Sequence, residues 1–229
     1  MIVVVTSDFH GHLPPEGAVP DCDLLIVAGD CIPVGNFHGS LVGDPASADL
    51  TPFGVWLRSQ PAKHIVGVAG NHDAFAFDYE DEVRKLPWHY LHDESVELEI
   101  DGRPWKIWGS PRTTPFAMWP RETPDDAYGR VLRSIPDETE IVITHGPPYG
   151  ILDKVGRDRA GSIALTERLR ELPSLRLFAC GHIHESYGMT LVPMGQGSES
   201  ELAWVPCVNG AYVDGRFQPS NPPIRVELV

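Results

Sequence analysis

The sequence has few cysteines and few basic residues for its length. Its four cysteines in 229 residues show no C-x-x-C spacing, which argues against a thiolate zinc site or a dithiol redox motif. The cysteines lie in or beside apolar runs, so we predict reduced, partly buried thiols in a cytoplasmic protein. Eighteen Lys and Arg stand against 32 Asp and Glu, giving a formal net charge of −14. This balance disfavours an extended nucleic-acid groove, which needs basic side chains to neutralise phosphates.

Long apolar runs, repeats and low-complexity tracts are also missing. No segment approaches the ~18 consecutive apolar residues of a membrane helix, so we expect no membrane span. A strand pattern begins at residue 2 without a basic leader, and we therefore expect no secretory signal. The length, with 42% apolar and 22% charged residues, is typical of one layered globular unit. We predict a single domain over residues 1–229.

The pattern of apolar runs predicts an α/β (α+β) fold. Strand-like and helix-like segments alternate in the first half, which favours a parallel sheet covered by helices. The alternating stretch 96–108, with Asp101-Gly102 at its centre, predicts a hairpin that opens a second sheet. We therefore expect a two-sheet β-sandwich flanked by helices. The expected strands are 2–6, 24–28, 64–69, 141–143, 175–180, 189–193, 203–208 and 224–228, and the expected helical segments are 52–59, 78–86, 125–135 and 162–172.

Five of the strand-like runs end in short polar clusters. In open α/β sheets, ligands gather beyond the carboxyl ends of the strands, so the clusters predict one shared site. The site would be rich in imidazole and carboxylate groups, which suit a pair of hard to borderline divalent ions. The residues able to bind metal in these clusters are Asp8, His10, Asp30, Asn71, His145, His182 and His184.

Each cluster taken alone has an ordinary structural explanation. Asp8 and His10 would point the same way in an extended chain, but they could equally lie in a solvated loop. Gly-Asp at 29–30 also serves as a common turn, and His182 and His184 could be a satisfied pair in the core. Only their joint occurrence at strand ends indicates function.

In this order, the clusters resemble the five-block signature of the calcineurin-like metallophosphoesterases. The blocks are Asp8-x-His10, Gly29-Asp30, Gly70-Asn71-His72-Asp73, Thr144-His145-Gly146 and Gly181-His182-x-His184. The resemblance extends to the small MPPED-type branch through the segments 108–111, 141–148, 180–188 and 217–223. It implies the metallophosphoesterase-like sandwich. It also implies that Asp8, His10, Asp30 and His184 hold one metal while Asp30, Asn71, His145 and His182 hold the other, with Asp30 bridging.

Two ions about 3.5–4 Å apart can stabilise both the attacking and the leaving oxygen at phosphorus, and a metal-bound hydroxide needs no protein nucleophile. We expect the metal to be Mn²⁺. Fe, Zn, Co and Mg are alternatives, because oxygen and nitrogen ligands of this kind bind all of them. His72 is not among the seven assigned metal ligands and is predicted to protonate the leaving oxygen. Asp73 is predicted to orient His72, with a turn or helix cap as the alternative.

The predicted function is metal-dependent hydrolysis of a small phosphodiester, with cyclic nucleotides favoured by the MPPED-type resemblance. The alternatives are a phosphomonoesterase of the same fold and a non-catalytic interaction module. A protein Ser/Thr phosphatase is disfavoured because Cys31 and Ile32 follow Asp30 where an Asp-Arg-Gly element is expected. No Gly-x-x-x-x-Gly-Lys motif supports a kinase or ATPase.

The substrate-binding residues are not predictable from the sequence, and neither is the oligomeric state. A small anionic phosphoester is the expected partner. Several loop residues could contact it but have ordinary roles as well, either on the surface or in packing: His12, His38, Arg112, Trp119 and Tyr149.

Overall fold

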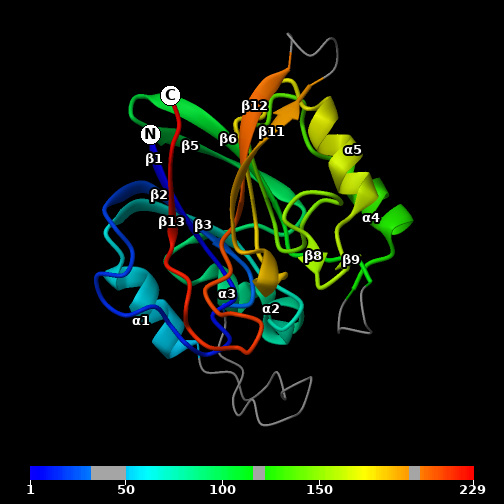
Figure 1. The fold of residues 1–229 in the computed structure, drawn as a ribbon. Helices are drawn as coiled ribbons and strands as arrows, with labels where there is room; N and C mark the ends of the chain where they lie inside the picture. Colours follow the sequence, from blue (N-terminus) through cyan, green and yellow to red (C-terminus); the bar gives the residue numbers. More distant parts are fainter. Residues whose placement is uncertain (32–49, 116–121, 196–201) are drawn as a thin grey trace.

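Two β-sheets pack face to face with helices on their outer surfaces in the computed structural model (Figure 1). The structure describes residues 1–31, 50–115, 122–195 and 202–229. The first sheet has the strand order β13-β1-β2-β3-β4, and the second has the order β11-β12-β10-β7-β6-β5. The predicted two-sheet sandwich flanked by helices is confirmed.

The first sheet is built from strands early in the chain and one strand near its end. Strands β1 to β4 run parallel to one another, and β13 pairs antiparallel with β1. Every residue of β2 is buried, as expected for a parallel strand covered on both faces. The strands of this sheet are β1 (Ile2–Thr6), β2 (Cys22–Ala28), β3 (Ala62–Val68), β4 (His89–Tyr90) and β13 (Ile224–Glu227).

The second sheet begins with the predicted hairpin. β5 and β6 pair antiparallel around Asp101-Gly102, then β6, β7, β10 and β12 run parallel, and β11 closes the far edge. A separate two-stranded ribbon of β8 and β9 was not predicted. The strands are β5 (Glu94–Ile100), β6 (Arg103–Ser110), β7 (Ile141–Thr144), β8 (Lys154–Val155), β9 (Asp158–Arg159), β10 (Leu177–Cys180), β11 (Gly188–Met194) and β12 (Ala203–Asn209).

The helices lie outside the sandwich, and α1, α4 and α5 precede the site-bearing strands β3, β7 and β10. In α5, Ser162 caps the first turn by accepting a hydrogen bond from Leu165 N at 2.9 Å, and Pro173 prevents continuation. The acidic segment predicted at 78–86 is divided into two short helices that meet at Tyr79. The helices are α1 (Thr51–Ser59), α2 (Ala74–Asp78), α3 (Glu80–Arg84), α4 (Asp125–Leu132), α5 (Ile163–Glu171) and the 3₁₀ turn η2 (His184–Ser186).

Three apolar clusters hold these layers together. The central cluster joins the inner faces of the two sheets, for example Ile26 and Val68 with Ile143 and Ala179. A second cluster covers the outer face of the first sheet with α1, and a third covers the second sheet with α4 and α5. Because apolar burial is the dominant favourable contribution to folding, this arrangement fixes the relative position of the strand ends.

Candidate metal centre

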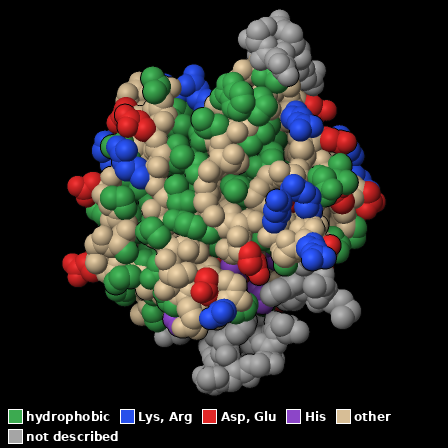
Figure 2. All heavy atoms as spheres, in the orientation of Figure 1, with side chains coloured by type: hydrophobic (Ala, Val, Ile, Leu, Met, Phe, Trp, Pro, Cys, Tyr) green, Lys and Arg blue, Asp and Glu red, His purple; other side chains and the backbone are tan. Residues whose placement is uncertain are grey.

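The carboxyl ends of five strands from both sheets meet at one place. β1, β2 and β3 of the first sheet deliver their polar clusters there, and β7 and β10 of the second sheet deliver theirs. Figure 2 shows histidine side chains gathered near the lower edge of the described surface. The structure brings together all seven residues predicted to bind metal: Asp8, His10, Asp30, Asn71, His145, His182 and His184.

The side chains form two groups of possible metal ligands. The ligand atoms of Asp8, His10 and His184 lie within 4.8 Å of one another, and so do those of Asp30, His145 and His182. In the first group, His184 Nε2 lies 3.3 Å from Asp8 Oδ1 and 3.2 Å from His10 Nε2. Each group contains three of the residues that the family resemblance assigns to one ion.

Asp30 lies between the two groups. Its Oδ2 atom is 3.2 Å from His145 Nε2 and 3.6 Å from His10 Nε2, while its Oδ1 accepts a hydrogen bond from His72 N at 2.8 Å. Asn71 Oδ1 lies 3.1 Å from His145 Nε2 and so adds an amide oxygen to the second group. One carboxylate therefore touches both sets of ligands.

Backbone carbonyls orient two of the histidines. His145 Nδ1 lies 2.8 Å from Ala28 O, and His184 Nδ1 lies 3.2 Å from Asp214 O. A carbonyl oxygen can only accept, so each Nδ1 carries a proton and each Nε2 faces the site, where it can bind a metal once it is deprotonated. This arrangement fixes the tautomer that metal-binding histidines require.

The backbone turns sharply at four of the ligands. Asp8, His10, Asp30 and His182 have φ values of 53°, 43°, 50° and 67°, in the left-handed region that non-glycine residues seldom occupy. The extended conformation expected for residues 8–10 is therefore wrong. β1 ends at Thr6, and two left-handed residues rather than strand alternation direct Asp8 and His10 to the same site. Such strain costs about 1–3 kcal/mol per residue and is typical of functional sites.

Glycines leave the room that the ligands occupy. A Cβ atom on Gly70 would lie 2.6 Å from both Asp30 N and His145 Nε2, and one on Gly181 would lie 2.8 Å from Ser7 Cβ and against Asp8 Oδ2. Neither position can take a side chain without displacing a ligand. The glycines in Gly70-Asn71 and Gly181-His182 therefore belong to the architecture of the site.

Neighbouring histidines keep the two buried carboxylates ionised. Burial alone would raise the pKa of Asp8, but the hydrogen bond from His184 and the charges of His145 and His184 outweigh it and lower the pKa to about 2. Burial opposes ionisation of Asp30 too, and the charges of His145 and His72 hold its pKa well below the usual range. Asp8 also accepts hydrogen bonds from His182 N at 3.0 and 3.1 Å.

The imidazoles differ in their charge. Burial lowers the pKa of His10 to about 4 and that of His182 to about 3, so both are neutral at pH 7. Burial works against the charge on His145 as well, yet the nearby Asp30 carboxylate raises its pKa to about 9. Two carboxylates, an amide oxygen and four imidazoles form an oxygen and nitrogen donor set that fits borderline divalent cations.

Comparison with known proteins identifies the family. Residues 1–186 match the family model described as calcineurin-like phosphoesterase. The chain belongs to the calcineurin-like phosphoesterase family. It is 31% identical over 250 residues to human metallophosphoesterase domain-containing protein 1, an alignment that covers 98% of this chain and 70% of the human protein. The MPPED-type resemblance is thereby confirmed.

Two further matches have different names. The chain is 28% identical over 236 residues to the UPF0046 protein K07C11.7 of Caenorhabditis elegans, covering 93% of this chain and 72% of that protein. A solved structure of phosphopantetheinyl hydrolase from Mycobacterium tuberculosis superimposes with a TM-score of 0.54 at 15% identity, covering 98% and 95% of the two chains. At that identity the likeness shows only the fold.

Family membership and the two ligand groups make this chain a metal-dependent phosphoesterase, and the family implies a dinuclear centre of divalent ions. Among the described residues, no helix is both long and apolar enough to cross a bilayer.

The phosphoesterase site also contains the two residues predicted to act in catalysis. The ring of His72 lies with its centroid 5.1 Å from that of His10, and the residue is 8% exposed. Asp73 is fully buried, and its Oδ2 accepts hydrogen bonds from Gly70 N at 2.8 Å and Cys31 N at 3.2 Å. Asp73 thus ties the loop after β2 to the loop after β3, as a turn-stabilising carboxylate would.

Sequence reasoning assigned no role to Phe217. Its ring packs edge-on against His10 and His184, with centroid distances of 4.9 and 5.1 Å, and its φ is 59°. Asp214, in the same loop, supplies the carbonyl that accepts from His184. Phe217 begins the segment 217–223 that carries part of the MPPED-type resemblance, and this was the one signal in the sequence that pointed to the loop.

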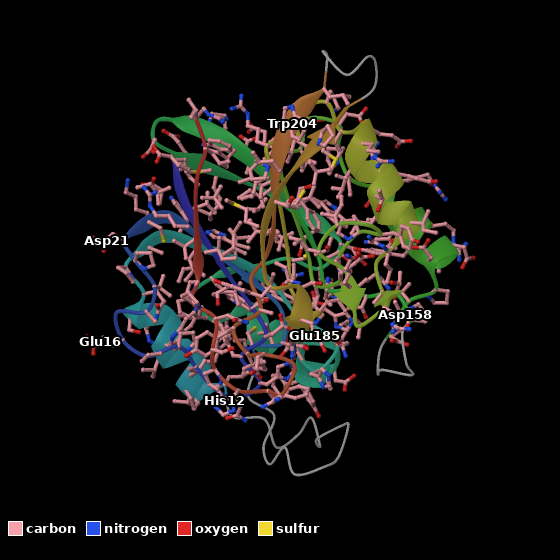
Figure 3. All side chains as sticks on the ribbon, in the orientation of Figure 1. His12, Glu16, Asp21, Asp158, Glu185 and Trp204 are labelled. Carbon is pink, nitrogen blue, oxygen red and sulfur yellow. The ribbon has the colours of Figure 1, made fainter. Side chains whose placement is uncertain are left out.

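The other candidate residues have different environments. Arg112 donates to Asp93 Oδ2 from Nε at 2.9 Å and from Nη2 at 2.6 Å. This ion pair gives Arg112 a structural role. Tyr149 is 46% exposed, so simple packing does not describe it. His12 lies exposed at the molecular surface (Figure 3). His38 and Trp119 lie outside the described residues.

Proposed function

We propose that this protein is a dinuclear metal-dependent phosphodiesterase that hydrolyses small diesters, with cyclic nucleotides as the favoured class. The observation that carries the proposal is the position of Asp30 between the two ligand groups, 3.2 Å from His145 Nε2 and 3.6 Å from His10 Nε2. A carboxylate shared by two ions sets their separation, and paired ions suit displacement at phosphorus.

The proposed ligands follow from the two groups. One ion would be held by Asp8, His10, Asp30 and His184, and the other by Asp30, Asn71, His145 and His182, a division supported by the side-chain clustering. When bound, the ions supply Lewis acidity and an activated water, with Mn²⁺ as the expected metal.

The protein itself would supply a proton and an enclosed site. His72 lies next in sequence to Asn71, donates its backbone amide to Asp30 and places its ring beside His10. We assign it the protonation of the leaving oxygen, a task suited to an imidazole. The burial of Asp8, Asp30 and His145 removes water from around the reacting groups and strengthens every charge interaction there.

The domain organisation and the cellular location of the enzyme are part of the proposal. We propose that residues 1–229 act as one domain and that the enzyme works in the cytoplasm on a small anionic substrate, as the buried, unpaired thiols favour. A phosphomonoesterase of the same fold is the alternative activity, because the ligand geometry suits both kinds of ester.

A substrate panel tests the proposal. The protein is stripped with EDTA, reloaded separately with Mn²⁺, Fe²⁺, Zn²⁺, Co²⁺ or Mg²⁺, and assayed with bis(p-nitrophenyl) phosphate, 2′,3′- and 3′,5′-cyclic nucleotides and p-nitrophenyl phosphate. We expect the highest turnover with diesters and Mn²⁺. Hydrolysis of monoesters alone would establish the alternative activity, and a metal-loaded protein inert to every ester would refute an enzymatic role.

Substitution of His72 tests the mechanism. His72→Ala should lower kcat by about 10²–10⁴-fold, the usual range for a general acid, while the metal content stays at two ions. His89→Ala is the matched control, since His89 is exposed in β4 and not one of the ligand residues. A His72→Ala variant with unchanged kcat would remove the residue from the mechanism.

A further inference from the structure

A cavity opens next to η2, the short turn that begins at the metal-centre residue His184. It has a volume of about 500 Å³ and lies between the loop that follows β7, the ribbon of β8 and β9, helix α5 and strand β11. Its lining includes three basic side chains and one aromatic side chain in a chain of net charge −14. The residues that matter here are Tyr149, Asp153, Lys154, Arg159, Arg170 and Ser186.

The charges in this cavity do not cancel. Asp153 is fully buried, accepts a hydrogen bond from Gly150 N at 2.9 Å and pairs with Arg159, whose Nη1 lies 2.5 Å from Asp153 Oδ1. Lys154 and Arg170 form no ion pair with any residue in the described part of the chain. Two positive charges are therefore left facing the cavity, which favours an anionic ligand.

Tyr149 gives the cavity an aromatic wall. The residue is 46% exposed, and the Arg159 guanidinium carbon lies 5.7 Å from the centre of its ring. Its backbone is fixed from both sides, because its N–H donates to Ser162 O at 2.8 Å and its carbonyl accepts from Thr166 Oγ1 at 2.9 Å. An exposed ring on a fixed backbone, beside basic groups, can stack on a planar group of a phosphorylated ligand.

The cavity adjoins the metal centre through the main chain. Lys154 N donates to Ser186 Oγ at 2.9 Å, and Ser186 Oγ donates to Lys154 O at 3.0 Å. Ser186 lies two residues after His184, so their Cα atoms are at most about 7 Å apart. Figure 2 shows Lys and Arg side chains on the same face as the histidines and above them, with an acidic side chain between the two groups.

We propose that this cavity is a subsite for a second phosphate group of the substrate, so that the preferred substrate is a diester carrying a further terminal phosphate. The inference rests on the proposed phosphodiesterase function. The diester would lie at the metal centre, the terminal phosphate would contact Lys154 and Arg170, and Tyr149 would support the intervening nucleoside. Phosphate oxygens accept charge-assisted hydrogen bonds from Arg and Lys, which are roughly twice as strong as neutral ones.

Two dinucleotides provide a matched pair of substrates. Thymidylyl-(3′→5′)-thymidine and its 5′-phosphorylated form contain the same diester and differ only in one terminal phosphate. With Mn²⁺-loaded protein, we expect kcat/KM to be about tenfold higher for the phosphorylated form, the effect of about one net charged hydrogen bond. In the double variant Lys154→Gln, Arg170→Gln, the ratio of the two kcat/KM values should fall to about one.

The double variant Arg58→Gln, Arg133→Gln is the control. It makes the same change in net charge at two exposed arginines, in α1 and at the end of α4, that form no ion pair with described residues. It should keep the preference for the phosphorylated substrate. Equal kcat/KM values in the wild type, or a preference that survives in the Lys154 and Arg170 variant, would overturn the subsite.

Calorimetric titration separates the subsite from the proposed function. Metal-free wild type should bind the phosphorylated dinucleotide more tightly than the plain one, and the Lys154 and Arg170 variant should lose this difference. If neither dinucleotide is hydrolysed, the proposed function fails for this class while the titration still decides the subsite. Equal binding of both ligands to the wild type would refute it.

Discussion

Substitution of Asp73 tests how the metal site is supported. Oδ2 of this buried carboxylate accepts hydrogen bonds from Gly70 N at 2.8 Å and Cys31 N at 3.2 Å, and so joins the loops that carry Asn71 and Asp30. Asp73→Ala leaves two amides buried without that acceptor, and each such loss costs about 1–3 kcal/mol. We therefore expect the free energy of unfolding to fall by about 2–6 kcal/mol, a large fraction of the ~5–15 kcal/mol typical of a folded protein.

The asparagine variant sharpens the test. Asp73→Asn can place its amide oxygen where Oδ2 lies and keep both hydrogen bonds, so it should lose only about 1–2 kcal/mol through the weaker neutral acceptor. If the carboxylate charge also orients His72, Asp73→Asn should lower kcat more than its small effect on stability explains. An unchanged kcat would leave Asp73 with a structural role alone.

Urea denaturation of metal-free protein, followed by the fluorescence of its six tryptophans, measures these differences. Asp126→Ala is the control, because this exposed aspartate forms a single surface ion pair among the described residues, with Arg130, and the variant should change stability by less than about 0.5 kcal/mol. The reasoning is refuted if Asp73→Ala unfolds at the same urea concentration as the wild type.

Three further predictions concern the ions. Asp30→Asn should lose both ions together, as measured by metal analysis, and retention of one ion would contradict bridging. Because the pKa of His145 is raised to about 9, its proton must leave when metal binds. Stopped-flow mixing of protein and metal with a pH indicator at pH 8 should detect this proton release. The apparent affinity for the metal should rise with pH up to about 9. Phe217→Ala should weaken Co²⁺ binding at the His10 and His184 group by about tenfold, because the variant loses the ring that packs against both ligands. Titration followed by Co²⁺ absorption measures this affinity.

Much of the fold was predictable because strand burial leaves a clear mark in the sequence. Residues 24–28 of β2 form a continuous apolar run, and Gly29-Asp30 follows directly at its carboxyl end. The rule that ligands gather at such ends then places Asp30 near the other clusters without any knowledge of contacts. The same reasoning failed for β8 and β9, since two residues per strand are too few to show a period.

The details of the site depend on contacts that residue types do not encode. The carbonyls of Ala28 and Asp214 that orient His145 and His184 are backbone atoms, which every residue has. The left-handed turn at His10 is uncommon for a non-glycine residue and follows from tertiary constraints on the loop. For Phe217, more than 30 residues after His184, only the folded chain brings the ring to the ligand.

Each ligand group draws on both sheets, and this division links the site to the whole sandwich. Asp8 and His10 follow β1 of the first sheet, whereas His184 follows β10 of the second. In the other group, Asp30 comes from the first sheet, and His145 and His182 come from the second. Neither sheet alone supplies the complete ligand set proposed for either ion. The apolar contacts between the inner faces therefore set the distances between ligands, and the left-handed strain at the strand ends is sustained by the stability of that core.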